Sequence, residues 1–347
     1  MKNGIAIDLG TTNVVMERID EEGRIVNQIS FVNPQREYGK DVISRMEASR
    51  EGHDKELKAI ILKAINQAVY ELDCGEKAEN IVIAGNTTML HLLQGYSLET
   101  MSKHPFRPIT LEKEEIIFAE RETILLPGIS AFVGADILSG LYALNANEWE
   151  KPNLFIDLGT NGEMALGDRT NILCTATAAG PAFEGNISVQ LQGTDVIALI
   201  GELIQKGIID QTGLLGDEYF EMGYPVKNGY LTQRYIREIQ MAKAAIYTGV
   251  ESLLELYGIT AEDVGNVYLA GAFGYYLDTE MAFTIGLLPK QFRGKVKMVG
   301  NTSLAGAKKY CMLQEIEDMK RIKQNCSAIN LANLSEFDER YLQAINF

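Results

Sequence analysis

The feature that most constrains the fold of this chain is a five-residue sequence that occurs twice. Ile7-Asp8-Leu9-Gly10-Thr11 reappears letter for letter as Ile156-Asp157-Leu158-Gly159-Thr160. In both places an apolar run leads into the Asp, a Gly-polar turn follows, and two further alternating runs come next. The strands predicted by these runs are residues 4–9, 14–19 and 24–31, and then residues 154–158, 163–166 and 171–176. Two matching meanders indicate two similar lobes.

Each copy places a carboxylate at the end of a strand, directly before Gly-Thr. Glycine lets the backbone approach a ligand closely, and successive N–H groups with threonine hydroxyls form a nest for phosphate oxygens. A carboxylate beside phosphate acts through Mg²⁺ and its waters. A single Asp-x-Gly-Thr is more often an ordinary hairpin turn, but turn chemistry does not require identical flanks in two places. We therefore expect two such turns to face each other and hold a triphosphate, with Asp8 and Asp157 on the metal side.

Strand, Gly-rich turn and helix alternate along the rest of the chain, which predicts the α/β class. The further Gly-rich turns lie at residues 85–88, 134–136, 271–274 and 300–303. Helical periodicity marks residues 54–72 and 234–257. The turn at 85–88 either contacts an anion or hydroxyl or only caps a helix. Lys243, in the second periodic segment, is either a ligand contact or a lysine whose stem packs while its amine reaches solvent.

Charge and composition exclude several function classes. Acidic residues outnumber basic ones 47 to 32, and the resulting net charge of −15 repels polyanions, so nucleic acid is an unfavourable partner. No apolar run reaches the roughly 18 residues that span a bilayer, so we expect no membrane segment. The opening residues show no secretory signal pattern, and we expect a cytoplasmic protein. With only three histidines, a metal here should be a hard ion held by carboxylates, namely Mg²⁺.

In the order of these pieces the chain resembles the acetate and sugar kinase, heat-shock chaperone and actin (ASKHA) superfamily. Within it, the chain is similar to the ATP-dependent reductive activators of corrinoid proteins. The phrases that carry this resemblance are Tyr38-Gly39-Lys40-Asp41-Val42-Ile43-Ser44-Arg45, Gly85-Asn86-Thr87-Thr88-Met89, His104-Pro105-Phe106, Ile156-Asp157-Leu158-Gly159-Thr160-Asn161-Gly162-Glu163, Ala179-Gly180-Pro181-Ala182-Phe183-Glu184-Gly185 and Leu269-Ala270-Gly271-Ala272-Phe273-Gly274-Tyr275. The resemblance implies a two-lobed actin-like ATPase fold, with duplicated ribonuclease H-like lobes around a nucleotide cleft. Residues 1–150 would form the first lobe, completed by helices in 305–347, and residues 151–304 the second.

The same resemblance implies the site residues, with ATP and Mg²⁺ as the bound groups. Asp8 and Asp157 would hold Mg²⁺ through water. Phosphate contacts fall on Gly10, Thr11, Thr12 and Asn13 in the first lobe and on Gly159, Thr160, Asn161 and Gly162 in the second. Adenosine contacts fall on Gly271, Ala272, Phe273 and Gly274, and ribose contacts on Gln240 and Lys243. Asp136 would orient an attacking water or a substrate hydroxyl; the alternative is a carboxylate favoured there by the helix dipole.

The function implied is an ATPase that drives a corrinoid protein, or the corrinoid subunit of a methyltransferase, from Co(II) to Co(I). Typical members carry an iron–sulfur domain, but Cys74, Cys174, Cys311 and Cys326 lack cluster spacing. We therefore expect no iron–sulfur cluster in this chain, and a separate ferredoxin-like electron donor. The region between Gly185 and Val196 also looks shorter than in the family. Two alternatives stay open, a small-molecule kinase and a nucleotide-dependent scaffold, and a homodimer is one open assembly state.

Overall fold

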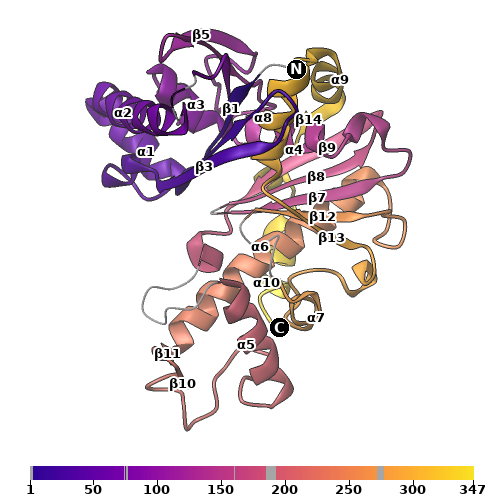
Figure 1. Ribbon diagram of the computed structural model, residues 1–347. Helices are drawn as coiled ribbons and strands as arrows, with labels where there is room; N and C mark the ends of the chain where they lie inside the picture. Colours follow the sequence, from indigo (N-terminus) through magenta and orange to yellow (C-terminus); the bar gives the residue numbers. More distant parts are fainter. Residues whose placement is uncertain (1–2, 74, 76, 160, 185–192, 272–276) are drawn as a thin grey trace. The chain divides into compact units, whose positions relative to one another are not determined.

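The computed structural model describes residues 3–347 apart from 74, 76, 160, 185–192 and 272–276. The chain divides into two compact units, each combining a mixed sheet with helices. The first unit is Met1–Glu148 with Asn301–Ala328, and the second is Trp149–Gly300 with Ile329–Phe347. Figure 1 labels their elements along the chain. The predicted α/β class is confirmed.

The first unit is built on a six-stranded sheet in the order β3-β2-β1-β4-β6-β5. Its strands are β1 (Gly4–Leu9), β2 (Asn13–Ile19), β3 (Ile25–Val32), β4 (Asn80–Gly85), β5 (Glu114–Phe118) and β6 (Arg121–Leu125). The first three form the predicted antiparallel meander, and β4 pairs parallel to β1. Because parallel strands end at the same edge, Asp8 and Leu9 lie beside Ala84 and Gly85.

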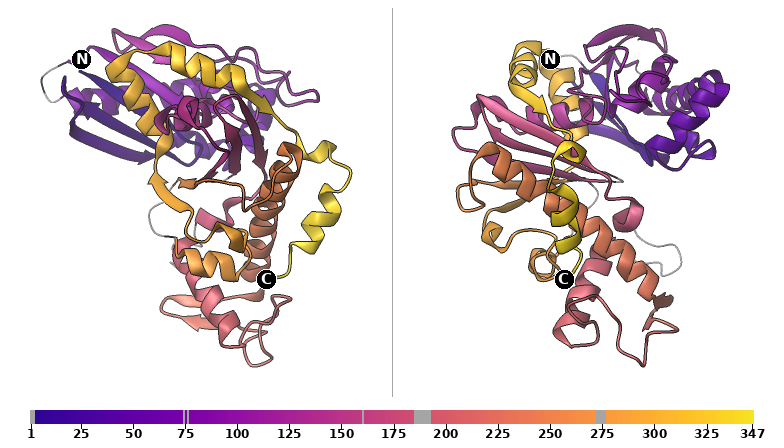
Figure 2. Two further views of the ribbon diagram at one scale, coloured as in Figure 1. Left: turned by 90° about the vertical axis from the view of Figure 1, so that its right-hand side faces the viewer. Right: turned by 180° about the vertical axis from the view of Figure 1, so that it is seen from behind.

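Alternate residues of β1 face two different helical layers, as the period of two in a strand requires. Ile5, Ile7 and Leu9 join a core that also contains residues of α2 (Asp54–Asp73) and α3 (Thr87–Gln94). On the other face, Gly4 and Asp8 lie against α8 (Thr302–Leu313), which packs in turn on α4 (Ala135–Ala143). Figures 1 and 2 show α2 and α8 on opposite sides of this sheet. The remaining elements of the unit are α1 (Val42–Ala48), α9 (Ile316–Asn325) and β14 (Cys326–Ala328).

The second unit repeats the meander and adds its own helices. Within it the strand order is β13-β12-β7-β8-β9, with β12 parallel to both β7 and β13. The strands are β7 (Asn153–Leu158), β8 (Gly162–Asp168), β9 (Asn171–Thr177), β12 (Val267–Ala270) and β13 (Val296–Gly300), with a hairpin of β10 (Tyr224–Val226) and β11 (Gly229–Leu231). The helices are α5 (Gly193–Gln205), α6 (Gln233–Tyr257), α7 (Thr279–Thr284) and α10 (Phe337–Gln343). In the part of the chain described, no helix is both long and apolar enough to cross a membrane.

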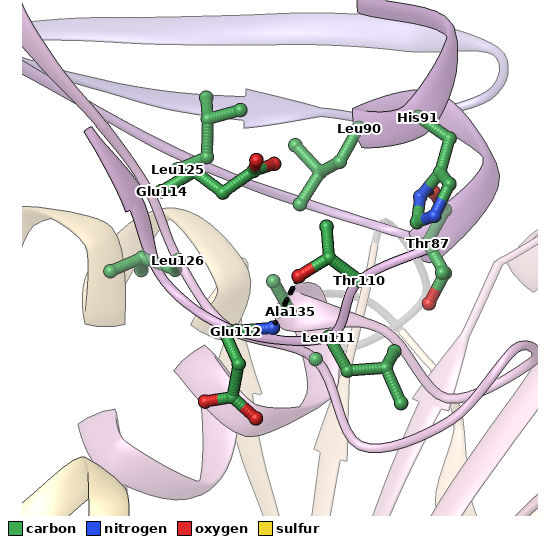
Figure 3. A pocket seen from close by; sticks show the side chains of 11 residues that line it. Thr87, Leu90, His91, Thr110, Leu111, Glu112, Glu114, Leu125, Leu126 and Ala135 are labelled. Carbon is green, nitrogen blue, oxygen red and sulfur yellow. Dashed lines mark hydrogen bonds between the residues drawn. The ribbon is translucent and has the colours of Figure 1, made fainter. Parts of the chain in front are cut away.

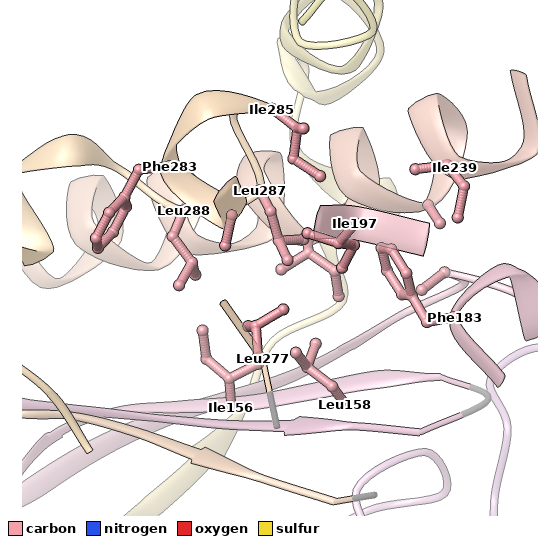
Figure 4. Close-up of a cluster of buried hydrophobic side chains, with 14 of the residues drawn as sticks. Ile156, Leu158, Phe183, Ile197, Ile239, Leu277, Phe283, Ile285, Leu287 and Leu288 are labelled. Atoms are coloured by element: carbon pink, nitrogen blue, oxygen red, sulfur yellow. The ribbon is translucent and has the colours of Figure 1, made fainter. Parts of the chain in front are cut away.

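Burial of one face of β7 organises the core of the second unit. Ile156 and Leu158 point from the strand toward the helical layer (Figure 4) and belong to one core with Ile197 of α5 and Ile239 of α6. Phe183 fills the space between sheet and helices. Since neighbouring residues of a strand face opposite ways, Asp157 lies on the face of β7 away from this core.

The boundaries of the units differ from the sequence-based ones at the end of the chain. The expectation was that helices in 305–347 complete the first lobe, but residues 329–347 group with the second unit. Ile329 N–H donates to the Cys174 carbonyl at 2.7 Å, and Phe347 N–H donates to the Gln211 carbonyl at 2.9 Å. Hydrogen bonds at both ends of the segment therefore join it to the second unit. The local sequence of residues 329–347 does not indicate these long-range contacts.

Candidate functional site

Two carboxyl groups predicted to act in chemistry meet in the first unit. Asp8 ends β1, and Asp136 lies in the first turn of α4. Ser303 Oγ donates to Asp8 Oδ1 at 2.7 Å, and Asn301 Nδ2 donates to Asp8 Oδ2 at 2.8 Å. Asp136 Oδ1 accepts the N–H of Ile137 at 2.9 Å. The Asp8 carboxylate is therefore held by the start of α8, more than 290 residues away along the chain.

The protein around these carboxyl groups disfavours their charged forms. Burial raises the pKa of Asp8, and the hydrogen bonds from Ser303 and Asn301 only partly offset that effect. Burial, with the nearby charge of Asp8 as a further cause, raises the pKa of Asp136 to about 7. Both side chains keep part of their surface accessible. A divalent cation near Asp8 would favour its charged form, whereas Asp136 can take up or release a proton near neutral pH.

Hydrogen bonds to its carbonyl groups hold the turn that follows Asp8. Asn33 Nδ2 donates to the Gly10 carbonyl at 2.8 Å, and Arg45 Nη2 donates to the Thr11 carbonyl at 2.6 Å. Asn33 N–H donates to the Thr12 carbonyl at 2.8 Å. A trans peptide points its N–H opposite its C=O, so the N–H groups of Thr11 and Thr12 are directed to the other side of the turn. That orientation is the one an anion-binding nest needs.

The turn after β4 supports the same structure. Asn86 caps α3, because its Oδ1 accepts the N–H of Met89 at 3.0 Å. The Nδ2 of Asn86 donates to Thr11 Oγ1 at 2.9 Å. The helix cap expected at residues 85–88 is confirmed, and Asn86 also orients a predicted phosphate-binding threonine, while a ligand contact at this turn stays a prediction. Asn13, the fourth predicted phosphate contact of this unit, begins β2 with an exposed side chain.

The second copy of the repeat also closes on a glycine turn. Gly159 N–H donates to the Asn161 carbonyl at 3.0 Å, and Gly162 begins β8. Ala270 pairs with Asp157, so the next residue, Gly271, lies beside the second copy of the repeated pentapeptide. A Cβ on Gly271, whose φ is +85°, would lie 2.5 Å from the Leu158 carbonyl and 2.7 Å from Asp157 Oδ1. Gly271 is thus required by close approach, and the predicted phosphate and adenosine motifs adjoin within this unit.

The predicted ribose contacts Gln240 and Lys243 are both buried on α6. Gln240 Nε2 donates to the carbonyls of Thr212 and Ile345, each at 3.0 Å. Lys243 Nζ donates to the Asn346 carbonyl and lies 5.6 Å from the centre of the Phe347 ring. Burial lowers the pKa of Lys243 to about 8. The alternative of an amine reaching solvent is therefore wrong, and residues 345–347 cover both predicted ribose contacts.

Some predicted contacts lie outside the described residues, and some supporting residues were not predicted. Thr160, Ala272, Phe273 and Gly274 belong to the first group. The second group consists of Asn33, Arg45, Asn301 and Ser303, which hold Asp8 and its turn. The sequence signal for them was weak: Asn301 and Ser303 stood in a Gly-rich turn, and Arg45 stood in a family phrase without an assigned role.

A small cavity beside α3 is not a ligand site. Its volume is about 20 Å³, which suits one water molecule and excludes a nucleotide. Figure 3 shows Thr87 and His91 of α3 together at its wall, across from residues 110–112. His91 Nε2 accepts the N–H of Ile109 at 3.1 Å, so its Nδ1 carries the proton that reaches the Thr87 carbonyl at 2.8 Å. His91 is therefore a structural link between α3 and the following segment.

Comparison with protein families decides where the chain belongs. A model of the C-terminal domain of RACo, the ASKHA domain, matches residues 151–190 and 187–347, and a model of the RACo middle region matches residues 3–148. The chain belongs to the RACo family. The resemblance to ASKHA activators that the sequence motifs indicated is thereby confirmed. The two RACo models also meet between residues 148 and 151, close to the division between the two units.

Relatives of this RACo-family chain include proteins that act on corrinoid proteins. The corrinoid activation enzyme RamQ of Eubacterium limosum is 31% identical over 423 residues, covering 99% of this chain and 70% of RamQ. The [Co(II) methylated amine-specific corrinoid protein] reductase of Methanosarcina barkeri is 23% identical over 418 residues, covering 99% of this chain and 77% of the reductase. The solved structure of a reductive activator for corrinoid,iron-sulfur protein matches with a TM-score of 0.89 and 28% identity.

That structural match covers 100% of this chain but 66% of the activator's chain, so this RACo-family chain spans just under two thirds of that protein. The actin-like fold expected from the motifs is confirmed by this match. The alignments with the two curated relatives are longer than the 347 residues of this chain, so both relatives carry aligned residues that have no counterpart here. The two matched segments of the C-terminal model overlap at residues 187–190, inside the region that looked shortened in the sequence.

Proposed function

We propose that this chain binds and hydrolyses Mg-ATP and uses that cycle to activate a corrinoid protein, promoting reduction of its cobalt from Co(II) to Co(I). Membership of the RACo family supports the proposal, as do the names of RamQ and of the corrinoid protein reductase. In this proposal each unit contributes one turn to nucleotide binding, residues 10–13 in the first and 159–162 in the second. The electron comes from a separate donor, and the partner is a corrinoid protein or a corrinoid methyltransferase subunit.

The observation that carries the proposal is the arrangement of Asp8 and its turn. The carbonyl groups of residues 10–12 accept hydrogen bonds from Asn33 and Arg45. The N–H groups of Thr11 and Thr12 are therefore directed to the other side of the turn, where they could donate to phosphate. Burial raises the pKa of the Asp8 carboxyl group, so a divalent cation beside it would relieve its unfavourable environment. Asp8, with Asp157 as the equivalent carboxylate of the second unit, would hold Mg²⁺ through water, and the ion would neutralise charge on the phosphates.

Asp136 is the residue we propose for proton transfer. A general base works best when its pKa lies near the operating pH, and the value of about 7 for Asp136 meets that condition. Its place in the first turn of α4 keeps the carboxyl beside Asp8, where the terminal phosphate is proposed to lie. Asp136 would then orient water for attack on that phosphate.

Binding of ATP drives activation only if the ATP-bound form holds the corrinoid protein more tightly than the free form does.

The test is ATP hydrolysis with and without a corrinoid methyltransferase subunit. Release of phosphate should increase when the corrinoid protein is added, and the two proteins should associate only in the presence of ATP. Asp8→Ala and Asp157→Ala should each lower turnover by about a hundredfold or more while far-UV circular dichroism stays unchanged. Glu21→Ala, in the exposed turn between β2 and β3, is the control and should keep full activity. Unchanged hydrolysis in both Asp variants would show that the site is misplaced.

A small-molecule kinase is the second candidate, because a carboxyl group with a pKa of about 7 could equally take a proton from a substrate hydroxyl. The products separate the two functions. An ATPase releases inorganic phosphate without a metabolite, whereas a kinase forms ADP only when one metabolite is present and leaves no free phosphate. A metabolite screen that yields stoichiometric ADP would favour the kinase.

A further inference from the structure

Arg45 is a buried cation directly beneath the turn proposed to bind phosphate. It lies on α1 with no exposed surface. Its Nη2 donates to the Thr11 carbonyl at 2.6 Å and its Nε donates to the Gly39 carbonyl at 3.0 Å. Its Nη1 lies 3.0 Å from the sulfur of Met89. Two main-chain oxygens and a thioether thus surround a guanidinium group that usually pairs with an acid.

No carboxylate lies within ion-pair distance of Arg45 among the residues that the structure describes. Asp41 and Arg36 act on the guanidinium from further away and with opposite signs, and burial lowers the pKa of Arg45 to about 10. The group is therefore still charged near neutral pH. Burying a cation without a counter-ion is in general unfavourable for a fold. The family phrase that contains Arg45 places this unfavourable charge where an anion is expected.

Arg45 affects the turn in two ways: its hydrogen bond orients a peptide group, and its charge lies close by. The bond from Nη2 holds the Thr11 carbonyl toward the interior, and the N–H of Thr12, in the same peptide plane, points the other way. A neutral donor in place of Arg45 could keep this orientation, but it could not supply the positive charge. A bound polyphosphate would provide the negative charge that the Arg45 environment lacks.

We propose that Arg45 is a positioning residue for nucleotide phosphates, which orients the Thr11–Thr12 peptide and stabilises bound phosphate through its buried charge. This role rests on the proposed function. It predicts that the contribution of Arg45 to binding increases with the number of phosphate groups on the ligand. A residue that merely maintained the fold would affect all nucleotides and adenosine by the same factor.

Calorimetric titration with a non-hydrolysable ATP analogue, ADP, AMP and adenosine tests this, each with Mg²⁺. Arg45→Gln should weaken binding of the triphosphate analogue by about tenfold or more, because it removes a buried positive charge that attracts the phosphates. The loss should be smaller for ADP and absent for adenosine. Arg45→Lys keeps the charge and should retain more triphosphate affinity than Arg45→Gln does. Arg121→Gln is the matched control, because Arg121 is also buried but pairs with Asp73 at the beginning of β6, whereas Asp8 lies at the other end of the parallel strands.

The outcomes separate this role from the function on which it rests. Wild-type protein that binds no nucleotide overturns both. Wild-type binding combined with an equal loss for every ligand in Arg45→Gln, or with no loss for the triphosphate, overturns the role of Arg45 alone. If Arg45→Gln does not fold, as judged by circular dichroism, Arg45→Lys decides. Its loss should be larger for the triphosphate than for adenosine, and a uniform loss would refute the proposal.

Discussion

A single added methyl group at Gly306 should disturb the contact between α4 and α8 that brings the carboxyl groups together. Asp136 is carried by α4, and α8 begins with the residues that hold Asp8. The two helices approach so closely that a Cβ on Gly306 would lie 2.0 Å from the Ser139 carbonyl oxygen and 2.4 Å from Ser139 Oγ. Ser139 Oγ also donates to the Ser303 carbonyl at 2.8 Å. The Cβ added by Gly306→Ala would therefore collide with a main-chain carbonyl group, which cannot move aside as the end of a flexible side chain can.

The expected change in the free energy of unfolding combines two destabilising contributions with one stabilising contribution. Ordinary contacts with a Cβ begin near 3.4 Å, so the two helices must separate by about 1 Å or more. Overpacking of this kind costs about 1–3 kcal/mol. Weakening the Ser139–Ser303 hydrogen bond adds about 1 kcal/mol, while alanine gains about 1 kcal/mol over glycine inside a helix. The net expectation for Gly306→Ala is a loss of about 2 kcal/mol in the free energy of unfolding.

Urea unfolding followed by circular dichroism measures this loss, and ATP turnover measured well below the transition tests its consequence for the site. Turnover should fall several-fold in the folded variant, because α4 moves relative to the start of α8. Gly201→Ala is the control: Gly201 lies within α5, and the three atoms nearest to a Cβ there belong to the side chain of Met281, the nearest being its sulfur. A Gly306→Ala protein as stable as the wild type, or more stable, would refute the reasoning, since helix propensity alone would then have decided the sign.

Two further predictions concern His91 and the end of the chain. Burial lowers the pKa of His91 below its usual 6.5, so neutral His91 contributes stability that is complete above about pH 6.5 and is lost as the pH falls through the lower folded value. His91→Gln should reduce that acid dependence of the unfolding midpoint and His53→Gln, at an exposed site, should not; equal slopes for wild type and His91→Gln would contradict this. Deleting residues 345–347 should expose Lys243 to amine-labelling reagents, detected by mass spectrometry, and should tighten nucleotide binding. Faster labelling without a change in affinity would remove Gln240 and Lys243 from the nucleotide site.

The sequence predicted those parts of the fold that local pattern determines. Both meanders were found because their first strands, β1 and β7, are largely buried and the turns that follow carry glycine and polar residues. The strands β5 and β6 were not predicted. β5 reads Glu114-Glu115-Ile116-Ile117-Phe118 at a sheet edge, where Ile117 is exposed, so its alternation does not mark a core. Residues 329–347 were assigned to the wrong side of the division because only distant contacts place them.

The candidate site divides in the same way. Asp8, Asp136 and Asp157 could be named because a carboxylate at the end of a strand or the start of a helix has a local signature. Ser303 and Asn301 could not be given a role, because their partner lies more than 290 residues earlier. Coverage of Lys243 by residues 345–347 is likewise invisible in the sequence, since the contacts span about a hundred residues.

Identical sequence does not give the two copies of the repeat identical surroundings. Asp8 accepts two hydrogen bonds from the start of α8, which follows the last strand of the other unit in sequence. Asp157 instead lies against the main chain at Gly271, where no Cβ fits. The first carboxylate is therefore stabilised by donors that a point substitution removes, and the second lies where a side chain on residue 271 would collide with it. Losing the hydroxyl of Ser303 should raise the pKa of Asp8 further, since a hydrogen bond that lowers it is gone, while Gly271→Ala should displace Asp157 by contact alone. The pentapeptide thus predicts strand, turn and ligand chemistry, and the neighbouring elements determine how each copy holds its charge.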